Sequence, residues 1–154
     1  MVESLGSIGS IGSIGGANFI IKAAELRSKA DTTLKGSFFG NLFAAKQDRK
    51  DDAKDLYSQA ANCYKHAKDP DQAVEMYLKA IECEADDGFK ANYYKEAALC
   101  MKGKDTQKYL QLITSAIKWY QMAGRMSQAC NMCKDCADKL EETYDYERAR
   151  EMYE

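Results

Sequence analysis

The chain has 154 residues, of which 45% are hydrophobic and 30% charged, and its formal net charge is −2. This composition is typical of one globular domain, and no apolar run approaches the roughly 20 residues that a membrane-spanning helix needs. Basic residues outnumber acidic ones only in residues 17–50, whereas nucleic-acid-binding domains are usually basic throughout. We therefore expect no nucleic-acid partner, but a local contact of the N-terminal end with an anionic partner.

Residues 1–16 contain repeated Gly-Ser-Ile triplets and predict a flexible, low-complexity leader. The start lacks the basic segment of a secretion signal, so we expect a cytoplasmic location. No strand precedes these glycines, which argues against a phosphate-binding loop. Residues 17–154 are expected to form one helical domain. Its first helix should begin at the capping residue Asn18, run to about Leu34 and end at Gly36.

A short apolar segment follows at residues 37–43, with basic side chains on both sides. One interpretation is that it plugs the end of the first helical layer. The other is that it dips into a membrane surface, where each phenylalanine would gain roughly 1.5–3 kcal/mol and each nearby basic residue about 1 kcal/mol on an anionic leaflet. This sum suits weak, reversible attachment. The candidate membrane-contact residues are Phe38, Phe39, Leu42 and Phe43.

Helical periodicity then continues through the rest of the chain. The pattern predicts helices at about 51–67, 70–84, 89–102, 107–123, 126–142 and 145–154. Short breaks join them at Asp69-Pro70, Asp86-Asp87-Gly88, Gly103, Gly124 and the Thr143–Asp145 region. Alternating helices with short connections predict an antiparallel stack.

Large and small residues recur in these helices at one spacing. The first copy is Tyr57, Ala60, Ala61, Tyr64, Ala73 and Tyr77. A copy with a longer middle is Tyr94, Ala97, Ala98, Met101, Ala116 and Tyr120. A last copy is Cys133, Cys136, Ala137, Leu140, Ala149 and Tyr153. Such spacing is close to the tetratricopeptide (TPR) pattern, since the small residues let helices approach and the aromatics fill the space between hairpins.

This spacing predicts an all-α fold, a right-handed alpha-alpha superhelix of TPR-like helical hairpins. The spacing stops with the chain and no polar cap follows, so we expect the N-terminal part of a longer array. Because stacked hairpins offer an extended surface and not a pocket, we expect a binding scaffold and not an enzyme.

The cysteines and the single histidine offer alternative sites. With no secretion signal, we expect the six cysteines to be reduced. Cys130, Cys133 and Cys136 have a spacing that can hold zinc or an iron–sulfur cluster. On a helix, however, such residues do not wrap around a metal, and small-residue packing is the favoured interpretation. His66 is expected at an exposed helix end and not in a catalytic site. We expect no cofactor.

Four segments, in order, resemble the alpha-type soluble NSF attachment proteins (the alpha-SNAP or Sec17 family). They are Ser37-Phe38-Phe39-Gly40-Asn41-Leu42-Phe43, Ala60-Ala61-Asn62-Cys63-Tyr64-Lys65-His66-Ala67-Lys68, Ala116-Ile117-Lys118-Trp119-Tyr120-Gln121-Met122-Ala123-Gly124-Arg125 and Tyr146-Glu147-Arg148-Ala149-Arg150-Glu151-Met152-Tyr153-Glu154. The resemblance covers about residues 17–154.

The resemblance implies an adaptor that coats a SNARE four-helix bundle of syntaxin-like proteins and recruits the AAA+ ATPase NSF to unwind it. It implies a role in membrane fusion, intracellular protein transport and ER–Golgi traffic, with peripheral membrane attachment through the residue 38–43 loop. Arg125 matches a basic SNARE-facing position. Weaker SNARE-binding candidates at hairpin ends are Lys65, Lys68, Lys102 and Lys104.

The chain departs from this family in two respects. Asn131 stands where members usually carry a lysine, six residues beyond Arg125. The C-terminal region that contacts the ATPase in the family has no counterpart here, so we expect weak SNARE or membrane binding without ATPase stimulation. An alternative function is a general TPR module that grips a short peptide, as co-chaperones do, with Asn62 and Lys65 in its groove.

Overall fold

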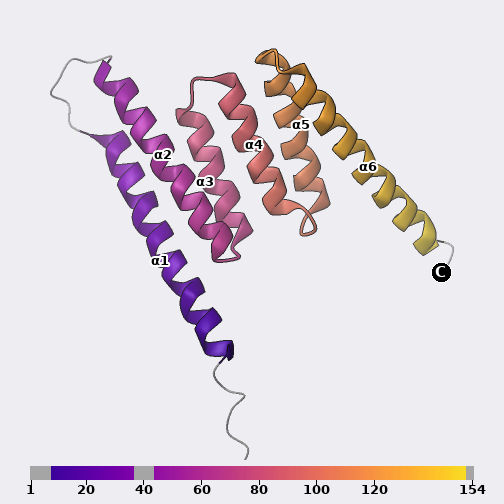
Figure 1. Cartoon of the computed structure of the whole chain (residues 1–154), viewed down its shortest axis with the longest axis horizontal. Coiled ribbons are helices and arrows are strands. Elements are labelled where there is room, and N and C mark those ends of the chain that lie inside the picture. Colours follow the sequence, from indigo (N-terminus) through magenta and orange to yellow (C-terminus); the bar gives the residue numbers. More distant parts are fainter. Residues whose placement is uncertain (1–7, 37–43, 152–154) are drawn as a thin grey trace, which may run out of the picture. The chain divides into compact units, whose positions relative to one another are not determined.

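The computed structural model describes residues 8–36 and 44–151, and the side chains of residues 15–36 and 46–144. All regular structure in this part is α-helical (Figure 1). The helices are α1 (Ile8–Lys35), α2 (Ala44–His66), α3 (Pro70–Cys83), α4 (Asp87–Met101), α5 (Thr106–Met122) and α6 (Met126–Glu151).

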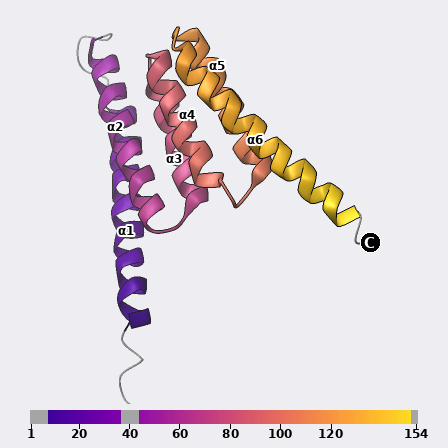
Figure 2. The ribbon, with the colours of Figure 1, turned by 45° about the vertical axis from the view of Figure 1, so that its right-hand side comes forward.

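The chain divides into two compact units, Met1–Ala85 and Asp86–Glu154. In the first unit α1 packs on α2 and α2 on α3, and in the second α4 packs on α5 and α5 on α6. Helices that follow one another run in opposite directions within each unit (Figures 1 and 2). The predicted all-α fold of consecutive helical hairpins is confirmed.

Aspartate caps set the starts of three helices. Asp69 accepts a hydrogen bond from the Gln72 backbone N–H at the start of α3 (3.2 Å), where Pro70 occupies the first turn. Asp86 and Asp105 accept equivalent bonds at the starts of α4 and α5, each at 2.9 Å. The predicted turns after Asp69 and at Gly103 and Gly124 are confirmed. These two glycines have φ of +83° and +70°, where a side chain would be strained.

The repeated spacing marks the core of the first unit. Tyr57, Ala60, Ala61, Tyr64, Ala73 and Tyr77 are all buried, as predicted. In the second unit Ala97, Ala98, Met101, Ala116 and Tyr120 are buried and Tyr94 is partly buried. Alanines at these positions allow the helix backbones to approach, which explains why the spacing can be recognised without a structure.

The last copy of the spacing is not packed in the same way, which corrects the expectation for Cys133. Cys133, Ala137 and Leu140 are exposed and Cys136 is only partly buried. The helix α6 instead uses Ala129 and Met132 against α5, in a cluster with Ala116, Tyr120 and Ala91. The same pattern is therefore buried or exposed according to which faces have a neighbouring helix.

Two helix boundaries differ from the prediction. We expected the first helix to begin at Asn18, but α1 begins at Ile8 and extends into the glycine-containing segment. The division into a leader and a helical domain stays a prediction. We also expected a break at Thr143–Asp145, but α6 continues to Glu151. Because Thr143 donates its hydroxyl proton to the Lys139 carbonyl (2.9 Å), this residue is accommodated inside the helix.

Three buried tyrosines of the spacing share a feature that the sequence did not indicate. Each donates its hydroxyl proton to a side chain of the preceding helix. Tyr57 of α2 bonds to Asp31 of α1 at 2.5 Å, and Tyr77 of α3 to Asn62 of α2 at 2.9 Å. Tyr120 of α5 bonds to Asn92 of α4 at 2.6 Å. The tyrosines therefore satisfy their hydroxyls while they fill the interhelical space.

The Asp31 site is the only one of these three with a charged acceptor. Lys79 of α3 also approaches the Asp31 carboxylate (3.4 Å) and lies 5.4 Å from the Tyr57 ring centroid. The Tyr57 hydrogen bond, with the Lys79 charge, lowers the pKa of Asp31 below its ordinary value. Burial and the Asp31 carboxylate raise the pKa of Tyr57 above its ordinary value. Through Asp31, all three helices of the first unit are linked.

Candidate partner-binding site

The predicted membrane-contact residues Phe38, Phe39, Leu42 and Phe43 lie outside the described residues. On either side of them, Lys35 and Lys46 are exposed. Arg49 packs near the end of α1, since a methyl group on Gly36 would lie 3.2 Å from its Cδ atom. The described residues beside the segment are therefore basic, as the membrane interpretation requires.

Arg125 occupies the turn between α5 and α6. Its backbone N–H donates to the Tyr120 carbonyl at 2.8 Å, and Gly124 supplies the positive φ that the turn needs. The Arg125 guanidinium reaches back to the first turn of α4 and lies over Gly88. A methyl group on Gly88 would stand 2.6 Å from Cζ and 2.7 Å from Nε of Arg125. Arg125 is therefore a partly buried, positioned cation.

The candidate lysines lie at other helix ends. Lys65 and Lys68 are exposed near the α2–α3 turn, where Lys68 has a φ of +59°. Lys102 and Lys104 are exposed at the α4–α5 turn. Within the second unit, these two lysines and Arg125 are at opposite ends of α4, which separates them by about 20 Å at 1.5 Å per residue. The structure therefore does not gather the candidates of this unit into one cluster.

The groove residues of the alternative peptide-binding function are already engaged. Asn62 accepts the Tyr77 hydroxyl bond described above. The Lys65 ammonium lies 5.9 Å from the centroid of the same tyrosine ring. These contacts explain both residues through the packing of α2 on α3, and they do not favour a peptide groove.

A cation–π pair beside Arg125 was not predicted. The Lys90 ammonium lies 4.4 Å from the Trp119 ring centroid and 3.2 Å from the Asp87 carboxylate. Lys90 and Trp119 are both partly buried, so the lysine stem and the ring cover part of the α4–α5 contact. The sequence signal was only a lysine in the first turn of one helix and a tryptophan in the next.

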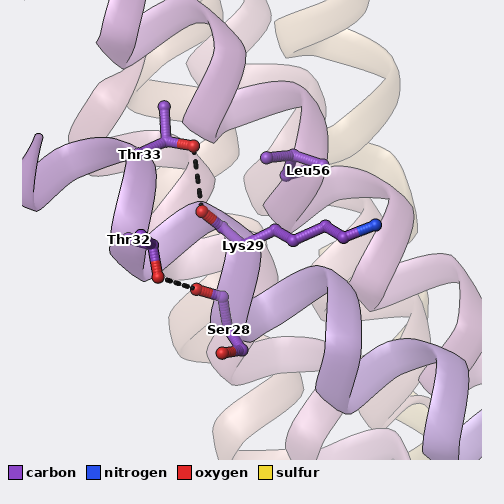
Figure 3. Close-up of a pocket in the computed structure, with 5 residues that line it drawn as sticks. All are labelled: Ser28, Lys29, Thr32, Thr33 and Leu56. Atoms are coloured by element: carbon purple, nitrogen blue, oxygen red, sulfur yellow. Dashed lines mark hydrogen bonds between the residues drawn. The ribbon is translucent and has the colours of Figure 1, made fainter.

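Two surface hollows have polar linings. One, of about 410 Å³, is lined by Ser28, Lys29, Thr32, Thr33 and Leu56 (Figure 3). The two threonine hydroxyls in it donate to backbone carbonyls of α1 at 2.8 and 2.9 Å, and the lysine side chain extends away from them. The other, of about 210 Å³, is lined by Lys102, Tyr109, Asp135, Asp138, Lys139 and Glu142.

The second hollow carries charges of both signs. Lys139 forms an ion pair with Glu142 at 2.9 Å, and this hydrogen bond lowers the pKa of Glu142 below its ordinary value. Burial raises the pKa of Tyr109, which keeps its hydroxyl neutral. The opposite charges neutralise one another locally, so this surface does not attract a strongly charged ligand of either sign.

The cysteines and the histidine show no arrangement for catalysis or metal binding in the described part. Cys63 and Cys83 are buried, and burial raises the pKa of the Cys83 thiol. His66 stacks on Phe19 with ring centroids 5.1 Å apart. Within residues 8–36 and 44–151, no group of His, Cys, Asp and Glu side chains could hold a metal ion. In the same residues no helix is long and apolar enough to cross a membrane.

Comparison with known proteins shows the family of the chain. The sequence model of the family described as "Soluble NSF attachment protein, SNAP" matches residues 21–154. The chain belongs to this family. The match includes the candidate membrane-contact and SNARE-binding residues and leaves out residues 1–20, so the family resemblance predicted from the four segments is confirmed.

Three curated relatives are similar to the chain. The alpha-soluble NSF attachment protein of Vitis vinifera is 29% identical over 136 residues, which cover 86% of this chain and 45% of the relative. The protein of the same name from Saccharomyces cerevisiae is 28% identical over 141 residues, covering 88% and 47%. The vesicular-fusion protein SEC17 of Komagataella phaffii is 26% identical over 125 residues, covering 78% and 42%. This SNAP-family chain thus spans less than half the length of these relatives.

Proposed function

We propose that this chain is a non-enzymatic adaptor of membrane fusion that binds the assembled SNARE four-helix bundle. The observation that carries the proposal is the SNAP-family match over residues 21–154, with Arg125 inside it. A relative that is named a vesicular-fusion protein supports the same process. The positioned Arg125 guanidinium would meet acidic side chains of the bundle, with the exposed lysines adding a long-range, salt-screened attraction.

The test of SNARE binding is a charge reversal. Arg125→Glu replaces an attraction by a repulsion, and we expect about a tenfold weaker pull-down of the assembled bundle at low salt, from roughly 1–1.5 kcal/mol for the changed pair energy. Lys118→Glu, on the exposed face of α5, is the matched control and should change the pull-down less. Equal binding of wild type and Arg125→Glu at low salt would contradict the assignment of Arg125.

The second part of the proposal is a weak membrane attachment through Phe38, Phe39, Leu42 and Phe43. It is supported by the apolar residues between basic neighbours and by the location of this segment inside the family match. Flotation with anionic liposomes should fall in the Phe38→Ser/Phe39→Ser variant, whereas Leu99→Ser, an exposed apolar position of α4, should float like wild type. Equal flotation of all three would remove the membrane contact from the proposal.

Recruitment of the NSF ATPase is proposed only for a protein that also contains the region by which the relatives exceed this chain. The chain covers 45% of the Vitis vinifera relative and 47% of the yeast one. We therefore expect the 154-residue chain to bind a SNARE bundle without stimulating ATP hydrolysis by NSF. An ATPase assay with the chain alone tests this, and stimulation would place an ATPase contact within these residues.

A further inference from the structure

Three large apolar side chains are more than half exposed at one end of the second unit. Phe89 is 54% exposed, and Met122 and Met126 are each 57% exposed. Met122 ends α5, Met126 begins α6, and Phe89 follows Gly88 in the first turn of α4. The contact of Arg125 with Gly88 brings these helix ends together. Exposed apolar groups concentrated in this way mark an interaction surface.

Gly88 determines where the cation of this surface lies. Since a methyl group at this position would overlap the Arg125 guanidinium, the absence of a side chain leaves the space that the guanidinium occupies. The group displaced by a larger residue would be the flexible end of an arginine and not the backbone. Gly88 is therefore a positioning residue for Arg125, with little part in the stability of the fold.

The surrounding charges favour a protein partner over a membrane. Asp87 is paired with Lys90 at 3.2 Å, and the Asp86 carboxylate accepts the Phe89 backbone N–H at 2.9 Å. The formal charges of Asp86, Asp87, Lys90 and Arg125 cancel, so the surface as a whole does not attract an anionic leaflet. A guanidinium among apolar side chains instead suits one carboxylate with apolar neighbours, as an amphipathic helix presents them.

We propose that Phe89, Met122, Arg125 and Met126 form a docking surface for one amphipathic helix of the SNARE bundle, at a carboxylate flanked by apolar side chains. This inference rests on the proposed function. The two methionines adapt their shape to different apolar neighbours, so the surface accepts helices of related but not identical sequence. The charge supplies the orientation and the apolar contacts supply the part of the affinity that salt does not weaken.

Titration of an assembled SNARE bundle at 50 to 500 mM salt separates these two contributions. For Met122→Ser/Met126→Ser we expect the Kd to rise about tenfold at every salt concentration, from the lost burial of two half-exposed side chains. Arg125→Gln should instead weaken binding mainly at low salt and flatten the salt dependence. Leu140→Ser, which changes a 50% exposed leucine of α6, is the control and should leave the Kd unchanged.

Gly88→Ala tests the position of the guanidinium. We expect it to weaken low-salt binding about as much as Arg125→Gln, and to add nothing in the Gly88→Ala/Arg125→Gln double variant. A merely structural role for Gly88 would give additive losses. Far-UV circular dichroism and the thermal midpoint confirm that each variant is folded.

The outcomes distinguish the inference from the proposed function. Wild type that does not bind the bundle overturns both. Wild type that binds, with an unchanged Kd for Met122→Ser/Met126→Ser, overturns the docking surface alone. If the same variant loses liposome flotation but keeps bundle binding, the surface belongs to a membrane and the inference is wrong.

Discussion

The hydrogen bond between Tyr57 and Asp31 allows a quantitative test of the packing in the first unit. Tyr57→Phe removes the hydroxyl that donates to Asp31 at 2.5 Å and leaves the ring in its buried place. A hydrogen bond to a charged group contributes roughly 1.5–3 kcal/mol. The Asp31 side chain is 38% exposed, and water replaces part of the lost interaction. We therefore expect the free energy of unfolding at pH 7 to fall by about 1.5 kcal/mol, the low end of that range.

The effect should depend on pH. The pKa of Asp31 is lowered in the folded state, chiefly by the Tyr57 hydroxyl, so the carboxylate contributes stability above its unfolded pKa of about 3.9. That contribution is lost as the pH falls through the folded pKa, because the unfolded chain then binds more protons than the folded one. The destabilisation by Tyr57→Phe should accordingly shrink below about pH 4, towards the value of a neutral hydrogen bond.

Tyr120→Phe is the matched control. Its hydroxyl occupies the corresponding place in the second unit but donates to Asn92, which is neutral. It should cost about 1 kcal/mol with no dependence on pH in this range. Urea unfolding between pH 3 and 7, followed by circular dichroism, measures both variants. Equal, pH-independent losses for the two would refute the charge-assisted role of Asp31, and no loss for Tyr57→Phe would refute the hydrogen bond itself.

Two further predictions concern the packing and the helix caps. Ala61→Leu should destabilise the chain by about 2–3 kcal/mol in urea unfolding, since Ala61 is fully buried and a larger side chain would push the helices apart. Ala137→Leu has the same place in the spacing but is exposed and should change stability by less than about 0.5 kcal/mol; a comparable loss there would mean that this face of α6 is packed. Asp69→Ala removes the α3 cap and should lower the thermal midpoint, by about 1 kcal/mol of stability, whereas Asp52→Ala on an exposed face of α2 should not.

The helical fold and much of its core followed from the order of residues alone. Buried alanines such as Ala60 and Ala98 recur at a spacing that places them on one side of a helix, and this periodicity is a property of the local backbone. Aspartate and glycine at the turns act on their nearest neighbours, so the starts of α3 and α5 were also predictable. The family was recognisable for a similar reason, because its segments are contiguous in sequence and the match confirms them over residues 21–154.

What depended on contacts between helices was not visible in this way. Cys133 and Leu140 repeat the spacing of Tyr57 and Tyr64, but they are exposed because α6 meets α5 with a different face. The acceptor of Tyr57 and the glycine beneath Arg125 each lie on another helix, at a distance along the chain that no local rule relates to the donor or the cation. Periodicity tells which side of a helix is apolar, whereas burial and the position of a charge are set by whatever packs against that side.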